Sequence, residues 1–238
     1  MSIDYPTELQ ARFERRIVEG AYGRDQVIGV DQLAQQLEAP IDEVLRVINT
    51  AQRKGLVADA AGGTMRVLGL PNTQFASVFT HAASSGLKPR SEVRQVEVEP
   101  ATIVVAERLR VDVGSPVYRY VRTRWVNEQA LANQTNYMPF EVCPGLEHDD
   151  VRRYSFQKLL EEKYAAVLVE MKEETLLVPA TARDREVLGL LKGATVLVVD
   201  RVAISATGWP LVWANIRIRP DRFEYVAALW PEGAKLLQ

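Results

Sequence analysis

Apolar residues recur at helical spacing in three segments near the start of the chain, and each segment ends at glycine or proline. The pattern predicts helices over residues 7–19, 31–37 and 41–54, with Asp31 as the N-cap of the second. Two short apolar runs flanking a Gly-Gly turn then predict a β-hairpin over residues 56–68. Three helices followed by a hairpin is the order of a winged helix-turn-helix.

The third predicted helix has a polar outer face opposite an apolar inward face, which is expected to comprise Ile41, Val44, Leu45, Ile48 and Ala51. The residues of this face, at i, i+3 and i+4 spacing, are Asp42, Arg46, Asn49 and Arg53. Because arginine can read guanine and asparagine can read adenine, Arg46 and Asn49 are candidate contacts to DNA bases. The candidate phosphate contacts are Arg15, Arg16, Arg53 and Arg66. The alternative for each of them is an ordinary solvated side chain.

The rest of the chain is rich in predicted strands and contains an internal repeat. Pro100-Ala101-Thr102 recurs 79 residues later as Pro179-Ala180-Thr181. At the same offset the matching pairs are Glu107 with Glu186, Leu109 with Leu188, Gly114 with Gly193, Val117 with Val196, and Arg122 with Arg201. Each copy reads as strand, short helix and hairpin, over 96–99 with 117–138 and over 167–178 with 196–218. We therefore expect one antiparallel sheet with pseudo-twofold symmetry, which makes the fold class α+β.

Alternation of side chains along the first hairpin strand separates two faces. One face carries Tyr118, Tyr120, Arg122 and Arg124, and the other carries Val117, Val121 and Trp125. Two guanidiniums about 7 Å apart on one strand repel each other unless an anion lies between them. The alternative is a solvated surface paired with nearby glutamates, and the sequence alone fits both interpretations.

Composition narrows the class of protein. With 238 residues, 47% of them hydrophobic and 25% charged, the chain is expected to fold as a small head of roughly 70 residues and a larger unit of roughly 160. No stretch reaches the length of a membrane span, and the start lacks a secretory signal, so we expect a cytoplasmic protein. One cysteine, Cys143, and two histidines offer no disulfide and no set of zinc ligands, so we expect no metal and no cofactor.

Charge counts against tight DNA binding by the head. Residues 1–70 hold eight basic side chains against ten acidic ones. Phosphate neutralisation supplies much of the affinity of DNA-binding domains, so a basic excess is the usual pattern.

The head resembles the GntR family of transcription regulators. Leu33-Ala34, Gly55-Leu56 and Gly63-Thr64 match its helices and wing in order and spacing. The contact positions differ: this chain has Ile28-Gly29-Val30 in place of Pro-Ser-Glu, Pro40-Ile41 in place of Ser-Arg, and Leu45 in place of a second arginine. The resemblance implies a winged helix-turn-helix that binds a double-stranded DNA operator.

Residues 75–225 resemble the UTRA sensor domain of the HutC subfamily, which has a chorismate lyase-like fold. The matching motifs are Gly86-Leu87-Lys88-Pro89, Arg122-x-Arg124, Asn136-Tyr137-Met138-Pro139, Pro144-Gly145-Leu146, Ser155-Phe156-x-x-Leu159-Leu160-Glu161 and Gly208-Trp209-Pro210. The resemblance implies a homodimer and an effector pocket in which two arginines and a helix-opening serine hold an anion. Those residues correspond to Arg122, Arg124 and Ser155.

The full set of candidate effector residues is Ser77, Tyr118, Tyr120, Arg122, Arg124, Gln134 and Ser155. Gln134 and Val212 stand where sugar-sensing relatives carry acidic residues, which removes two acceptors for hydroxyl groups. With Trp213 and the tyrosines on the same sheet, a small or apolar carboxylate is favoured over an amino-sugar phosphate.

These patterns predict a winged helix at residues 1–70, a linker at 71–76 and a dimerising sensor at 77–238. The expected function is a transcription regulator, such as a repressor, controlled by a small anionic effector. One alternative is a ligand-binding dimer whose DNA-binding head has degenerated, as the acidic head suggests. A further alternative is a chorismate lyase-like enzyme, against which stands the lack of a nucleophile and base pair.

Overall fold

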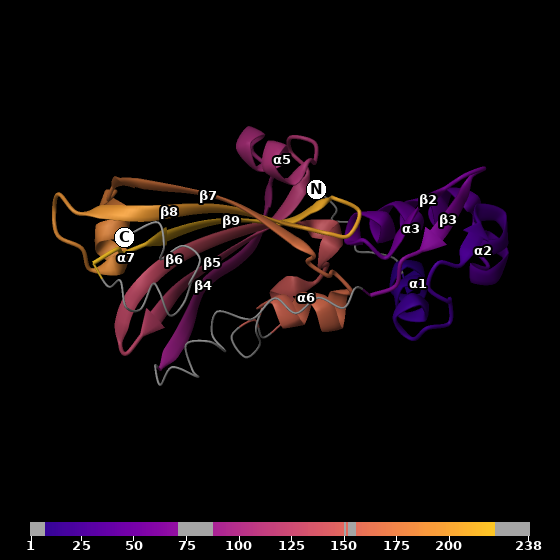
Figure 1. Ribbon diagram of the computed structural model, residues 1–238, viewed down its shortest axis with the longest axis horizontal. Helices are drawn as coiled ribbons and strands as arrows, with labels where there is room; N and C mark the ends of the chain where they lie inside the picture. The colour runs from indigo at the N-terminus through magenta and orange to yellow at the C-terminus, as the bar shows by residue number, and fades with distance from the viewer. Residues whose placement is uncertain (1–7, 71–87, 150, 152–155, 222–238) are drawn as a thin grey trace.

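The computed structural model describes residues 8–70, 88–149, 151 and 156–221, which form two bodies side by side (Figure 1). A small head of helices around a short sheet lies at one end. A long six-stranded sheet makes up the rest. None of the described helices is long and apolar enough to cross a membrane. The predicted linker at 71–76, Ser77 and Ser155 lie outside the described residues.

The head has the predicted three helices and hairpin. Its elements are α1 (Glu8–Val18), β1 (Val27–Gly29), α2 (Val30–Leu37), α3 (Ile41–Lys54), β2 (Val57–Ala60) and β3 (Thr64–Val67), with strand order β1-β3-β2. The apolar faces of the helices meet in a core that contains the fully buried Phe13, Leu33 and Val44. One expectation was wrong: Asp31 is not the N-cap of α2, because the helix begins one residue earlier, after Gly29. The strand β1 was not predicted.

The larger body is one antiparallel sheet with strand order β4-β5-β6-β9-β8-β7. Its first copy of the repeat comprises β4 (Pro89–Pro100), α5 (Ile103–Leu109), β5 (Pro116–Val126) and β6 (Gln129–Pro139). Its second comprises β7 (Glu170–Pro179), α7 (Ala182–Leu188), β8 (Thr195–Ile204) and β9 (Pro210–Ile218). Between the copies lie the 3-10 turns η1 (Phe140–Val142) and η2 (Leu146–His148), and then α6 (Phe156–Tyr164).

The internal repeat is visible in local geometry. Thr102 and Thr181 each cap the helix that follows with their side chains. Gly114 and Gly193 both take φ +87°, a left-handed conformation that favours glycine. Since the order of strands places β6 beside β9 at the centre, the two copies pair across a pseudo-twofold axis. The α+β fold class and the strand-helix-hairpin repeat are confirmed.

The two faces of the sheet carry different helices (Figure 1). On one face, Trp213 of β9 packs in the cluster of α5, and Arg217 of the same strand pairs with Asp184 of α7. On the other face, α6 covers the strand β5 through Tyr120, whose ring stacks on Phe156 with centroids 5.1 Å apart. The arginine-bearing side of β5 therefore faces α6.

The bodies meet where α3 ends. The Thr207 hydroxyl donates to the Gln52 carbonyl, and Arg53 pairs with Glu141 of η1 while its guanidinium lies over the Trp209 ring at 5.1 Å from the centroid. Gly55 ends α3 with φ +81°, and a Cβ on it would lie 2.8 Å from the backbone nitrogen of Ala206. Both the turn and the close approach of the two bodies therefore require glycine at this position.

Candidate functional site

The arginine face of β5 is buried. Tyr118 and Tyr120 have no exposed surface, and Arg122 is 9% exposed. A guanidinium taken out of water loses its hydration and needs a partner in return. The interpretation of this face as a solvated surface is therefore wrong for Arg122.

One neutral side chain lies between the two guanidiniums. The Gln134 Oε1 atom accepts hydrogen bonds from Arg122 Nε at 3.0 Å and from Arg124 Nε at 3.1 Å. The Gln134 amide nitrogen donates to Asn136 at 2.7 Å, and Asn136 donates to the Tyr120 carbonyl at 3.2 Å. This chain of bonds fixes the orientation of the glutamine, so its carbonyl points at both arginines.

The internal repeat supplies a comparison for Arg122. Its counterpart Arg201 lies opposite Glu173 on the neighbouring strand β7 and forms an ion pair with it. Arg122 instead lies opposite Val93 on β4 and opposite Gln134 on β6, and both are neutral. Within the described part of the chain, no carboxylate pairs with Arg122. One copy of the repeat thus neutralises its arginine and the other leaves a cation.

Electrostatics reinforce this contrast. Burial lowers the pKa of Arg122, and burial together with the positive charge of Arg122 holds the pKa of Arg124 well below its usual range. Arg201 adds to both effects from across the sheet. The Tyr120 hydroxyl is also buried and has no hydrogen-bond partner among the described residues. A bound anion would favour the charged guanidiniums, and a polar ligand could use the hydroxyl.

The surroundings of the arginines are aromatic and aliphatic. Tyr118 stacks on Phe140 at 5.2 Å, and both belong to one cluster with Met138 and the buried Val212. Trp213, in contrast, packs with α5 on the opposite face, and its indole nitrogen donates to Asp200 at 2.9 Å. Trp213 therefore does not line the arginine face, and its contribution to the expected apolar pocket was wrong.

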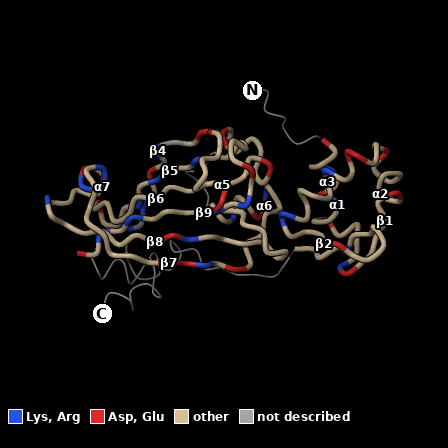
Figure 2. Tube along the Cα trace, turned by 90° about the horizontal axis from the view of Figure 1, so that it is seen from above, with Lys and Arg blue, Asp and Glu red and all other residues tan. Residues whose placement is uncertain are grey.

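The candidate DNA contacts are distributed unevenly over the head. Arg46 and Asn49 of α3, Arg15 of α1 and Arg66 of β3 are exposed. Arg16 lies over the Tyr22 ring, 5.1 Å from its centroid. Arg53 pairs with Glu141, so its guanidinium is directed to the larger body in this structure. Acidic and basic residues are interspersed along the trace of the head (Figure 2).

Sequence reasoning had not assigned Arg201, Glu173, Asn136 or Glu141 to any site. The repeat already paired Arg201 with Arg122, so the signal for Arg201 was present. The other three become meaningful only once strand register and the contact between the two bodies are known.

The larger body matches a known protein family. A model of the UTRA domain matches residues 84–224, more than half of the chain. The HTH-type transcriptional regulator GmuR of Bacillus subtilis (strain 168) is 29% identical over 136 residues, which are 57% of this chain and 57% of that protein. The HTH-type transcriptional repressor NagR of the same organism is 25% identical over 144 residues, 60% of this chain and 58% of that protein. The chain thus spans less than two thirds of the length of these relatives.

A solved structure resembles both bodies. The crystal structure of PhnF from Mycobacterium smegmatis gives a TM-score of 0.58 at 19% sequence identity, over 90% of this chain and 95% of that one. Identity this low shows the fold alone. The PhnF structure has a helical head before a sheet of this kind in one chain, as in the structure described above.

Proposed function

The chain belongs to the UTRA domain family, and on this premise we propose that it is a DNA-binding transcription regulator whose affinity for a double-stranded operator is changed by a small anionic effector. The named relatives are transcription regulators, which supports the role of the head. The main observation in favour of an anionic effector is the buried Arg122, which has neutral neighbours where its repeat counterpart Arg201 has Glu173. A role on DNA also leads us to expect the protein in the cytoplasm.

The chemistry of the site favours a compact carboxylate or phosphate. Two arginine side chains on one strand present their donors to the same place, and planar guanidiniums suit both anions. Next to them in the sheet, Gln134 faces Ile216 and Asn136 faces Ala214 across the β6–β9 pair. Aliphatic neighbours and few hydroxyl acceptors fit a carboxylate with an apolar body better than a phosphorylated sugar.

Binding of such an effector can be tested on the full chain by a thermal-shift screen of small carboxylates and phosphates, followed by calorimetry. Arg122→Ala and Arg124→Ala should each weaken binding of a hit by about tenfold to a hundredfold, because charge-assisted hydrogen bonds contribute about 1.5 to 3 kcal/mol. The matched control is Arg119→Ala, which removes an arginine from the other face of the same strand, where it pairs with Glu97 at 3.0 Å. Hits that bind all three variants like the wild type would contradict the site.

The contact between the bodies gives the effector a route to the head. The strand β6 carries Gln134, which accepts from both arginines, and leads directly into η1. In η1, Phe140 stacks on Tyr118 and Glu141 pairs with Arg53. A ligand that changes the position of β5 or β6 is thereby connected through packed side chains to the end of α3. We infer that the effector acts on DNA affinity through this junction.

The second candidate function is a ligand-binding dimer with a degenerate head. The observation in its favour is the head itself, where acidic residues outnumber basic ones and Arg53 turns away toward Glu141. Binding of the full chain to its own upstream DNA, measured from low to physiological salt, separates the two candidates. Affinity that falls with salt and exceeds the affinity for random DNA supports the regulator. A head that binds no DNA at low salt supports the degenerate dimer.

We also propose that the protein is not an enzyme. Cys143 is fully buried, and burial raises the pKa of its thiol, which disfavours the nucleophilic thiolate. In the described part of the chain, no group of three His, Cys, Asp or Glu side chains could hold a metal. Absence of turnover of a bound effector over hours would agree with this proposal.

A further inference from the structure

The exposed face of α3 is partly apolar in its first half. The helical pattern predicts Ile41 and Leu45 on the inward face, and this was wrong: Ile41 is 50% exposed and Leu45 is 49% exposed, one helical turn apart. The exposed polar residues of the same face are Asp42, Arg46 and Asn49, whereas Val44, Val47 and Ile48 point into the core. Two large aliphatic side chains therefore stand in water among hydrogen-bonding groups, although the helix has a separate buried face for its apolar residues.

The position of these side chains indicates what they meet. In a helix-turn-helix domain the second helix of the pair enters the major groove, and its N-terminal residues reach the base edges. The C5-methyl group of thymine is the apolar group that bases present there. We infer that Ile41 and Leu45 read thymine methyl groups, an inference that rests on the proposed binding to DNA.

The rest of the face supports DNA as the occupant. Arg46 lies next to Leu45, and Asn49 follows one turn later, so the aliphatic pair is flanked by groups that read guanine and adenine. Asp42 can accept a hydrogen bond from the amino group of cytosine at a base edge, and near phosphates it would be repelled. The mixed face thus suits the floor of the groove better than the phosphate backbone.

Geometry limits the positions of the thymines. Four residues of α-helix rise about 6 Å, and base pairs stack about 3.4 Å apart, so the two side chains span about two base-pair steps. At the other end of α3, Arg53 is paired with Glu141. The reading segment therefore runs from Ile41 to Asn49, and the preferred half-site contains two nearby thymines followed by an adenine.

Deoxyuridine provides the test, because it lacks the methyl group of thymine but keeps all its hydrogen bonds. Duplexes are first selected from a randomised library with the full-length wild-type chain, and each thymine of the selected half-site is then replaced singly by deoxyuridine. At one or two positions the replacement should weaken binding about fourfold, the effect of one buried methyl group. Leu45→Ala and Ile41→Ala should each remove the sensitivity at one of these positions.

Val18→Ala is the matched control, since Val18 is an aliphatic residue of the head that is 45% exposed but lies on α1. It should leave every deoxyuridine effect unchanged. Selected duplexes that tolerate deoxyuridine everywhere would overturn the inference and leave the DNA-binding function standing. If no duplex is selected at low salt, the proposed function fails and the inference fails with it. A change in the mass of the free protein on Leu45→Ala would make this face a contact between protein chains and would also overturn the inference.

Discussion

At the scale of single residues, the presence or absence of one carboxylate distinguishes the two halves of the sheet. Glu173 neutralises Arg201, while Val93 and Gln134 leave Arg122 to a neutral hydrogen bond. A buried cation with one neutral acceptor is unfavourable by itself, and a ligand anion can remove much of that cost. The residues that make this site selective are thus the neutral ones as much as the arginines.

Gln134→Glu should convert the site into a self-neutralised one. The substitution keeps the number of heavy atoms and places a carboxylate within hydrogen-bond distance of both arginines, where the glutamine now accepts at 3.0 and 3.1 Å. It also removes the amide that donates to Asn136, a neutral bond that contributes less than the two charged ones gained. We expect a higher melting temperature without effector and at least about tenfold weaker effector binding, because the carboxylate competes with the ligand. Thermal unfolding and calorimetry on one preparation measure both effects. Unchanged binding would show that the effector does not lie at these arginines.

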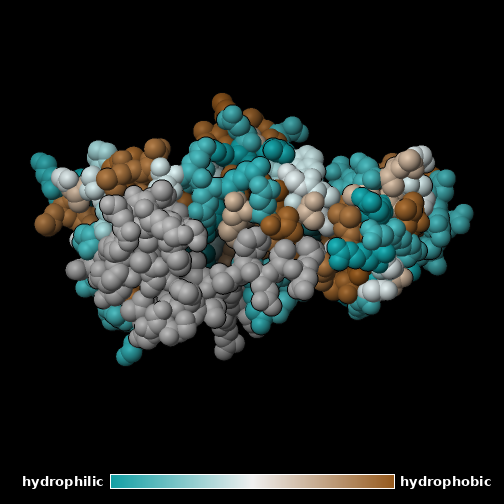
Figure 3. Space-filling model, in the orientation of Figure 1, coloured by the Kyte–Doolittle hydropathy of each residue, from teal (hydrophilic) through white to brown (hydrophobic). Residues whose placement is uncertain are grey.

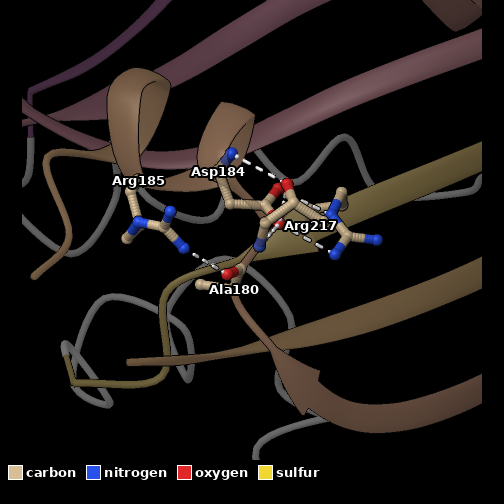
Figure 4. Close-up of polar contacts among 5 residues, drawn as sticks. Ala180, Asp184, Arg185 and Arg217 are labelled. Atoms are coloured by element: carbon tan, nitrogen blue, oxygen red, sulfur yellow. Dashed lines mark hydrogen bonds and ion pairs between the residues drawn. The ribbon is translucent and has the colours of Figure 1, made fainter. Parts of the chain in front are cut away.

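Asp184 should make the stability of the sheet depend on acid pH. It is 2% exposed and accepts from Arg217 Nε at 2.6 Å (Figure 4). It also accepts from Thr181, the N-cap residue of α7, with which it forms a capping box. Burial opposes the ionisation of Asp184 and raises its pKa. The hydrogen bonds from Arg217 and Thr181 outweigh this effect, so the pKa of Asp184 lies below its ordinary value of 3.8. A carboxyl with a lower pKa in the folded state contributes stability above its unfolded-state pKa, and this contribution is lost as pH falls through the folded-state value.

Asp184→Asn should therefore cost about 3 kcal/mol at neutral pH, because Arg217 loses its charged partner, and the difference from wild type should shrink toward pH 2. Denaturant unfolding at a series of pH values measures it. Glu186→Gln is the control, since Glu186 lies on the same helix but pairs with Arg183 at 3.2 Å on the surface. A variant whose deficit is constant with pH would contradict the assignment.

At the scale of elements, the strands and helices with clear periodicity could be predicted from the sequence. A strand of three residues and the contacts between distant elements could not. The alternation in β5 placed Tyr118 and Val117 on opposite faces, and packing bears this out, because Tyr118 belongs to the cluster of α6 and Val117 to the cluster of α5. β1 has three residues, too few to show a period, and it exists because it pairs with β3. The sequence placed Trp213 on the same sheet as the tyrosines but not on a particular face, because only the register of β9 shows which face it takes. The ion pair of Arg53 depends on the contact of two bodies, which local sequence does not encode.

The element that joins the two bodies, η1, should carry the effector response. Glu141→Gln removes the charge that holds Arg53, so the end of α3 loses its tie to the sheet. We expect the affinity of the free protein for the effector to stay within about twofold of wild type. The ratio of DNA affinities with and without effector, about 5- to 150-fold in ordinary allosteric proteins, should fall severalfold. Fluorescence anisotropy with labelled operator at saturating and zero effector gives this ratio.

Glu97→Gln serves as the control for that experiment. It removes a carboxylate that pairs with Arg119 of the neighbouring strand, inside the larger body. Its coupling ratio should equal that of the wild type. If Glu141→Gln behaves in the same way, the signal does not pass through the Arg53 contact.

At the scale of the whole molecule, the head lies at one end of an elongated body, so one chain presents a single reading helix (Figure 1). Apolar surface is also exposed on the larger body. Ile103 and Val104 of α5 are 73% and 55% exposed, and Figure 3 shows this surface over α5. Leu176 and Leu177 of the edge strand β7 are 66% and 59% exposed. Exposed apolar surface outside the head, together with an edge of β7 on which no other described strand pairs, supports the expectation that two chains associate through the larger body.

A dimer of this kind should bind a palindromic operator as a unit of two chains. For the free protein, light scattering should give a mass about twice the 26.7 kDa of one chain. In the complex it should give two chains for each operator duplex.

Because two heads joined by a rigid sheet fix the distance between the reading helices, half-sites should lie a whole number of turns apart, about 10 base pairs or a multiple. Inserting five base pairs at the centre rotates one half-site to the opposite side of the duplex and should weaken binding at least about tenfold. Five central substitutions without a change of length are the control. A protein that binds an isolated half-site as tightly as the full operator would show that one chain is the functional unit.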